Sequence, residues 1–112
     1  MQNSETLELN VQEPYFSLIK NGLKIVEGRL GKNKYFDLKM GDKVLFNNDL
    51  ERKVEKIVKY SSFREMLIFE GLKNVLPNVK SLEEGEKIYY QFYSKEDEQK
   101  YGVVAICLTK LN

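Results

Sequence analysis

The chain has 112 residues, of which 42% are hydrophobic and 31% are charged, and its formal net charge is +1. This length suits one domain, residues 1–112, and we expect it to act as a monomer. No apolar run approaches the roughly 20 residues that span a bilayer, and the first residues lack the features of a signal peptide. We therefore expect a cytoplasmic protein without membrane contact. The near-neutral charge excludes a generally polybasic protein but leaves room for a local basic surface.

Histidine is absent from the chain, and there is one cysteine. Acid–base chemistry therefore falls to glutamate, aspartate, lysine or tyrosine, and the usual zinc sites built on histidine or several cysteines are excluded. Cys107 has no partner for an internal disulfide and lies in the apolar run 103–108, which predicts a buried strand with an inert thiol. No spacing specifies a metal site, and no cofactor is expected.

The first predicted elements are a short helix and a charged strand. Pro14 suits a first helical turn, apolar residues follow at i, i+3 and i+4, and Gly22 is typical of a helix end, so we expect a helix over 14–21. A strand is predicted over 24–30, followed by a basic loop over 31–34.

A hairpin follows. Residues 43–47 alternate polar and apolar side chains, residues 52–60 form the second predicted strand, and the turn residues at 47–49 favour a reversal between them.

Two helices are marked by capping boxes, in which a serine precedes a glutamate by three residues. The helix capped by Ser62 is expected to run to about Glu70, and the helix capped by Ser81 is expected to continue its apolar stripe to residue 93. Residues 94–100 are then predicted as a turn. The aromatic residues expected in the core are Phe46, Phe63, Tyr89 and Phe92.

The segment from Gly22 to Arg29 concentrates three charged side chains. In an extended strand Glu27 and Arg29 share one face, whereas Lys24 starts on the other unless the turn after Gly22 re-aims it. Glu27 and Arg29 then form a structural ion pair or bind a polar ligand from a cleft. A simple solvated strand face remains a third interpretation.

A set of short motifs spans nearly the whole chain: Pro14-Tyr15-Phe16, Gly22-x-Lys24-x-x-Glu27-x-Arg29, Lys39-x-Gly41-Asp42-x-Val44-x-Phe46, Ser62-Phe63-x-Glu65-Met66, Gly71-Leu72, Val75-Leu76-Pro77, Phe92-Tyr93-Ser94 and Tyr101-Gly102-Val103. Taken in order, these motifs resemble the ASCH family, a branch of the PUA-like small β-barrels. The resemblance implies an α+β fold, in which helices pack against a small mixed β-barrel and a cleft between them is lined by the charged segment.

Because related PUA-like domains commonly bind RNA or modified nucleotides, the resemblance makes RNA or a nucleotide-like molecule the leading partner. Lys24 and Arg29 are then expected to hold a phosphate, while Glu27 orients Arg29 or accepts hydrogen bonds from the exocyclic amine of a base. The remaining candidates are a positive rim of Lys20, Lys32 and Lys34 and two stacking faces, Tyr15 and Tyr35.

The resemblance also leaves an enzyme interpretation open. Some bacterial ASCH-like proteins are amidohydrolases that remove acetyl from N4-acetylcytidine with a lysine and a threonine of this segment and a distal glutamate. Lys24 matches the lysine, Glu27 stands at the position of the threonine, and Glu70 corresponds to the distal glutamate. Lys24 is then the base, and Glu27 or Glu70 activates water. Ribonuclease activity on the same residues, with a tyrosine as proton donor, is a related interpretation.

A third interpretation is a protein-interaction module without catalysis. An exposed apolar patch in the helical segment, around Leu67, Ile68, Leu72 and Val75, favours it.

Overall fold

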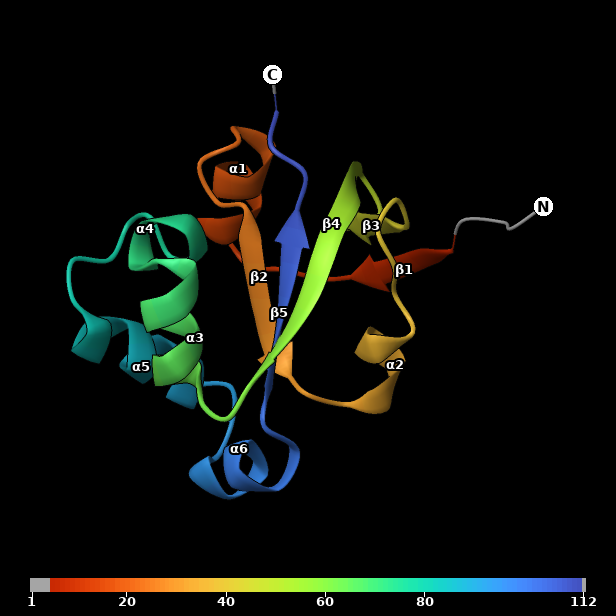
Figure 1. Cartoon of the computed structure of the whole chain (residues 1–112). Coiled ribbons are helices and arrows are strands. Elements are labelled where there is room, and N and C mark those ends of the chain that lie inside the picture. Colours follow the sequence, from red (N-terminus) through yellow and green to blue (C-terminus); the bar gives the residue numbers. More distant parts are fainter. Residues whose placement is uncertain (1–4, 112) are drawn as a thin grey trace.

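A computed structural model describes residues 5–111 of the chain as a mixed five-stranded half-barrel sheet with six helices packed against it (Figure 1). This is the α+β, PUA-like architecture that the sequence predicts. The elements are β1 (Thr6–Leu9), α1 (Tyr15–Lys20), β2 (Val26–Leu30), α2 (Asn33–Phe36), β3 (Lys43–Phe46), β4 (Leu50–Tyr60), α3 (Phe63–Glu70), α4 (Leu72–Val75), α5 (Leu82–Tyr90), α6 (Lys95–Tyr101) and β5 (Val103–Leu108).

The strand order is β1-β3-β4-β5-β2, with β1 parallel to β3 and every other pair antiparallel. The predicted hairpin is confirmed, because β3 and β4 pair across a turn in which Asn47 and Asn48 have φ values of 55° and 54°. Asparagine tolerates this left-handed conformation, and turns of this kind match the twist of paired strands. β1 and β2 are the edge strands of the described sheet, which therefore stays half open.

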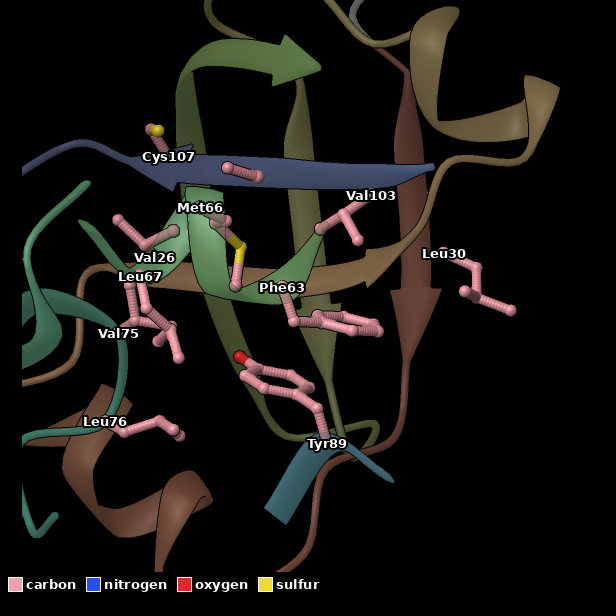
Figure 2. Close-up of a cluster of buried hydrophobic side chains, with 11 residues drawn as sticks. Val26, Leu30, Phe63, Met66, Leu67, Val75, Leu76, Tyr89, Val103 and Cys107 are labelled. Carbon is pink, nitrogen blue, oxygen red and sulfur yellow. The ribbon is translucent and has the colours of Figure 1, made fainter. Parts of the chain in front are cut away.

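The interior strand β5, which lies between β4 and β2, is buried on both faces, and successive side chains point to opposite faces of the sheet. One set of side chains packs against α3 and α5, and the other fills the inside of the half-barrel. In the helical cluster the rings of Phe63 and Tyr89 stack 4.4 Å apart with an interplanar angle of 8° (Figure 2). Phe46, Phe63 and Tyr89 are buried as predicted, and so is Cys107.

Both capping boxes form the caps that the sequence predicts. The hydroxyl of Ser62 accepts a hydrogen bond from the amide of Glu65 at 3.0 Å, and the hydroxyl of Ser81 accepts one from Glu84 at 3.2 Å. α3 ends at Glu70 before Gly71, as expected.

Three local predictions are wrong. The expected loop 31–34 instead leads into the short helix α2, and the expected turn 94–100 is mostly the helix α6, capped by Ser94 through the amide of Asp97. The strand expected over 24–30 begins only at residue 26.

The predicted apolar stripe of α5 also ends early. The helix stops at Tyr90, so Phe92 lies beyond it and is 50% exposed instead of buried in the core.

Of the described helices, none combines the length and the apolar character that crossing a membrane requires.

Candidate functional site

A cavity of about 330 Å³ opens between β2, the segment that follows β1, and the C-terminal end of α5. Its floor carries the three charged side chains of the segment that the sequence singled out, Lys24, Glu27 and Arg29. The cavity is walled by aromatic rings from α1, α5 and the turn after α5, namely Tyr15, Tyr89, Phe92 and Tyr93.

Lys24 is the innermost charged group of this site. It precedes β2, and the turn at Gly22, with φ +80°, lets the chain leave α1 so that the lysine points inward. Only 2% of Lys24 is exposed. Its Nζ donates to the carbonyl oxygens of Val26 and Val75, both at 2.6 Å, and lies 3.3 Å from Glu27 Oε1. Two carbonyl oxygens and one carboxylate oxygen thus surround the buried amino group.

Burial lowers the pKa of Lys24 from its ordinary value, and the neighbouring carboxylate of Glu27 opposes that shift. A buried lysine of this kind is stable when acceptors surround it. Lys24 therefore anchors the start of β2 to the end of α4 and positions Glu27.

Glu27 joins the two cations of the site. Its Oε2 accepts a hydrogen bond from Arg29 Nε at 2.8 Å, while Oε1 faces Lys24. Arg29 also donates through Nη2 to the backbone oxygen of Asn10 at 2.8 Å. Burial acts to lower the pKa of Arg29, but Glu27 and the neighbouring tyrosines outweigh it and raise that pKa overall. Two basic groups thus flank one carboxylate in this cluster.

The side chain of Arg29 is 17% exposed, so it is the cation of the cluster that remains accessible from the cavity. One end of its guanidinium is fixed by Glu27 and Asn10, which leaves other N–H groups for a ligand.

The tyrosines of the cavity wall keep their protons at neutral pH. Burial raises the pKa of Tyr89 well above its ordinary value, and the negative charge of Glu27 adds to that shift. Burial also raises the pKa values of Tyr93 and Tyr15. The wall thus offers aromatic faces together with neutral hydroxyls that donate or accept hydrogen bonds.

Gly28 lies on the floor of the cavity and permits close packing beneath it. A Cβ atom at this position would lie 2.6 Å from Met66 Cε and 2.9 Å from the hydroxyl oxygen of Tyr89. The missing side chain therefore lets α3 and α5 approach β2.

The structure brings four of the predicted site residues together, Tyr15, Lys24, Glu27 and Arg29. The others lie elsewhere. Lys20 is an exposed residue at the end of α1, and Lys32 and Lys34 are exposed beside α2. Tyr35 is 5% exposed and packs in the core inside the half-barrel, so it presents no stacking face.

Glu70 stands apart from the cavity in a small polar cluster between α3 and the sheet. Its Oε2 accepts a hydrogen bond from the hydroxyl of Tyr60, and its Oε1 accepts one from Cys107 Sγ at 3.4 Å. Burial, assisted by Glu70, raises the pKa of the Cys107 thiol to about 12. A thiol of this kind stays protonated and unreactive at neutral pH.

The apolar residues expected to form an interaction patch do not share one surface. Leu67 and Val75 are fully buried, whereas Ile68 is 51% exposed and Leu72 is only partly buried. The structure thus places half of this predicted patch in the core.

The sequence did not single out Tyr89, Phe92 or Tyr93 as site residues. Their helical spacing indicated core packing, and only the early end of α5 turns Phe92 and Tyr93 toward the cavity mouth. Phe92 and Tyr93 lie just after the end of α5, and such a position is only a weak sequence signal for a site residue.

Comparisons with known proteins give one family model and similar solved structures. The model of the ASCH domain matches residues 9–112. A crystal structure of the hypothetical protein PH0355 is 51% identical to the chain with a TM-score of 0.89, and the match covers 95% of this chain and 99% of that one. A solution NMR structure of protein PF0455 from Pyrococcus furiosus is 48% identical with a TM-score of 0.78, covering 96% and 98%. No curated protein matches the chain.

Proposed function

The chain belongs to the ASCH domain family, and we propose that it binds a nucleotide, free or within an RNA strand, in the cavity beside β2. The observation that carries this proposal is the Lys24–Glu27–Arg29 cluster at the floor of an aromatic-walled cavity. Cavities of about 300–1,000 Å³ are typical of small-molecule sites, and about 330 Å³ lies at the lower end of that range.

Each group of the site has a distinct task in this proposal. The base stacks on the tyrosine and phenylalanine rings of the wall, a contact that tolerates any base. Arg29 contacts the phosphate or a base edge, because part of its guanidinium is accessible. Glu27 accepts a hydrogen bond from an exocyclic amine, since each of its oxygens has a second lone pair. Lys24 holds Glu27 in place and does not reach the ligand, because its Nζ already donates to two carbonyl oxygens and lies 3.3 Å from Glu27.

Hydrolysis of a modified nucleoside is the second candidate function. The lowered pKa of Lys24, caused by burial beside a cavity, favours it. Two observations weigh against it. The Nζ of Lys24 donates to two carbonyl oxygens and lies 3.3 Å from Glu27, so protein acceptors already surround it, and Glu70 does not line the cavity. Binding therefore fits the geometry better than catalysis.

The proposal is tested by isothermal titration calorimetry with the four nucleoside 5′-monophosphates. We expect Arg29→Ala to weaken binding at least about tenfold, because a charge-assisted hydrogen bond is lost and each tenfold change corresponds to about 1.4 kcal/mol. Arg52→Ala is the matched control, because Arg52 lies outside the cavity and bonds to backbone oxygens of residues 20 and 51. Equal affinities of the wild type and Arg29→Ala would refute the site.

The same protein incubated with N4-acetylcytidine and with RNA, followed by mass spectrometry, separates the two candidates. Intact substrates together with nucleotide binding support the binding proposal. Release of cytidine or cleavage products that disappears in Glu27→Gln, with the fold intact by circular dichroism, would replace it with the enzyme interpretation.

A further inference from the structure

Six residues at one end of the sheet gather positive charge around two aromatic rings. They come from the segment around α2, the last turn of α6 and the C-terminal end of β4, which lie together where β2 and β4 end and β5 begins (Figure 1). We call this the basic aromatic surface, and it consists of Lys32, Lys34, Phe36, Lys59, Lys100 and Tyr101.

Three of the four lysines of the basic aromatic surface lie against its rings, and Lys34 lies over the ring of the buried Tyr35. Lys32 Nζ is 5.4 Å and Lys100 Nζ is 5.2 Å from the centroid of the Tyr101 ring, and Lys59 Nζ is 5.8 Å from that of Phe36. The segments are joined by a hydrogen bond of 3.0 Å from the Gly31 amide to the Gly102 carbonyl. The surface is therefore one continuous feature although its residues are far apart in the sequence.

These lysines carry charge that the described part of the chain does not neutralise. Within residues 5–111, the ion pairs closer than 4.0 Å involve none of the four lysines of this surface. Asp37 and Glu96 lie next to or on the same two helices, yet neither is among these pairs. A surface of unpaired cations attracts a polyanion, and that attraction depends on salt.

The basic aromatic surface adjoins the cavity along β2. Lys32 follows Arg29 by three residues, so their Cα atoms lie at most about 11 Å apart. Tyr35 of α2 is close enough to Arg29 and Tyr93 to contribute to the raised pKa of each. A strand with one nucleotide in the cavity therefore has its next nucleotides within reach of these lysines.

We propose that the ligand of the cavity is one nucleotide of a single-stranded RNA whose neighbouring nucleotides run across the basic aromatic surface. The inference rests on the proposed nucleotide binding and adds that the physiological ligand is a strand and not a free nucleotide. Cations beside one exposed ring, Phe36, and one partly buried ring, Tyr101, match a flexible strand, in which phosphates and unstacked bases alternate, better than a rigid duplex. Lys32 and Lys34, which the sequence analysis placed at the rim of the site, thus bind the strand on a surface next to the cavity.

The test compares two probes on two variants. The probes are the mononucleotide that binds best and a fluorescein-labelled, mixed-sequence single-stranded RNA of roughly ten nucleotides, a length that spans a typical single-strand site. The surface variant is Lys32→Ala/Lys59→Ala/Lys100→Ala. Its matched control, Lys53→Ala/Lys73→Ala/Lys110→Ala, removes the same charge from exposed lysines elsewhere.

We expect the surface variant to bind the mononucleotide like the wild type but to lose about tenfold or more in affinity for the RNA. Each phosphate contact to a single strand contributes roughly 0.7 to the slope of log affinity against log salt concentration. If all three lysines contact phosphates, the slope of the surface variant is therefore shallower than that of the wild type by about 2. Equal RNA affinity and slope in the surface variant and its control would overturn the inference, as would a wild type that binds the RNA no more tightly than the mononucleotide.

The readouts separate this inference from the proposed function. Unchanged mononucleotide binding in Arg29→Ala refutes the cavity as the nucleotide site, whatever the surface variant does. Normal RNA binding in the surface variant, with Arg29→Ala impaired, refutes only the path of the strand.

Discussion

Replacing Lys24 with methionine tests the central feature of the site. The substitution keeps an unbranched side chain of similar length but removes the buried ammonium group. The carbonyl oxygens of Val26 and Val75 then lose a hydrogen bond of 2.6 Å each, and Glu27 keeps only Arg29 as its charged partner.

The expected loss of stability follows from these contacts. A buried acceptor left without its donor costs about 1–3 kcal/mol, and two carbonyl oxygens are affected. Breaking a buried ion pair by removing one partner typically costs about 3–5 kcal/mol. Relief from burying the charge of Lys24 offsets part of this cost, so we expect Lys24→Met to lower the free energy of unfolding by about 3 kcal/mol.

Urea denaturation, followed by circular dichroism, measures this difference. Lys20→Met is the control, because Lys20 is exposed and its substitution is expected to change stability by no more than about 0.5 kcal/mol. A loss below about 1 kcal/mol in Lys24→Met would show that the ammonium group is not held as the distances indicate, and the anchoring role of Lys24 would then be wrong.

Two other features of the fold give further predictions. Gly31→Ala is expected to destabilise the protein more than Gly28→Ala, because a Cβ at position 31 meets a backbone oxygen of α6 at 2.6 Å, whereas at position 28 it meets the flexible end of Met66 at 2.6 Å. We expect about 1–3 kcal/mol for Gly28→Ala by urea unfolding, and the reverse order would contradict this packing. Burial raises the pKa of Cys107 from 9.0 to about 12, so its contribution to stability is complete below pH 9 and is lost as the pH rises through 12. Cys107→Ala should therefore make the free energy of unfolding fall less steeply above pH 9. An unchanged dependence of stability on pH would argue against a raised pKa of Cys107.

Local signals predicted much of the fold. The serines that cap α3 and α5, the asparagine turn between β3 and β4, and the apolar run of β5 each act within a few residues. α6 has a local signal too, a serine followed three residues later by an aspartate, but its segment lacks an apolar stripe and therefore resembles a turn. β1 has only four residues, and its pairing with β3 is a contact between distant segments.

The charged residues of the candidate site were predictable from the sequence, but the burial of Lys24 and the aromatic wall were not. The spacing of Glu27 and Arg29 indicated their pairing. The burial of Lys24 depends on Val75, which is 51 residues away, and no local pattern reports such a contact. For the same reason the sequence could not separate Tyr89, which packs on Phe63, from Phe92, which lies past the helix end at the cavity.

The position of β5 in the chain has a consequence for synthesis. Both core clusters take side chains from this strand, which lies between β4 and β2 and is the last strand in sequence order among the described residues. A nascent chain that ends before residue 103 thus lacks the shared wall of both cores, and β2 and β4 have no strand between them. Helices form early on a growing chain, but this sheet is complete only after residue 108 has left the ribosome.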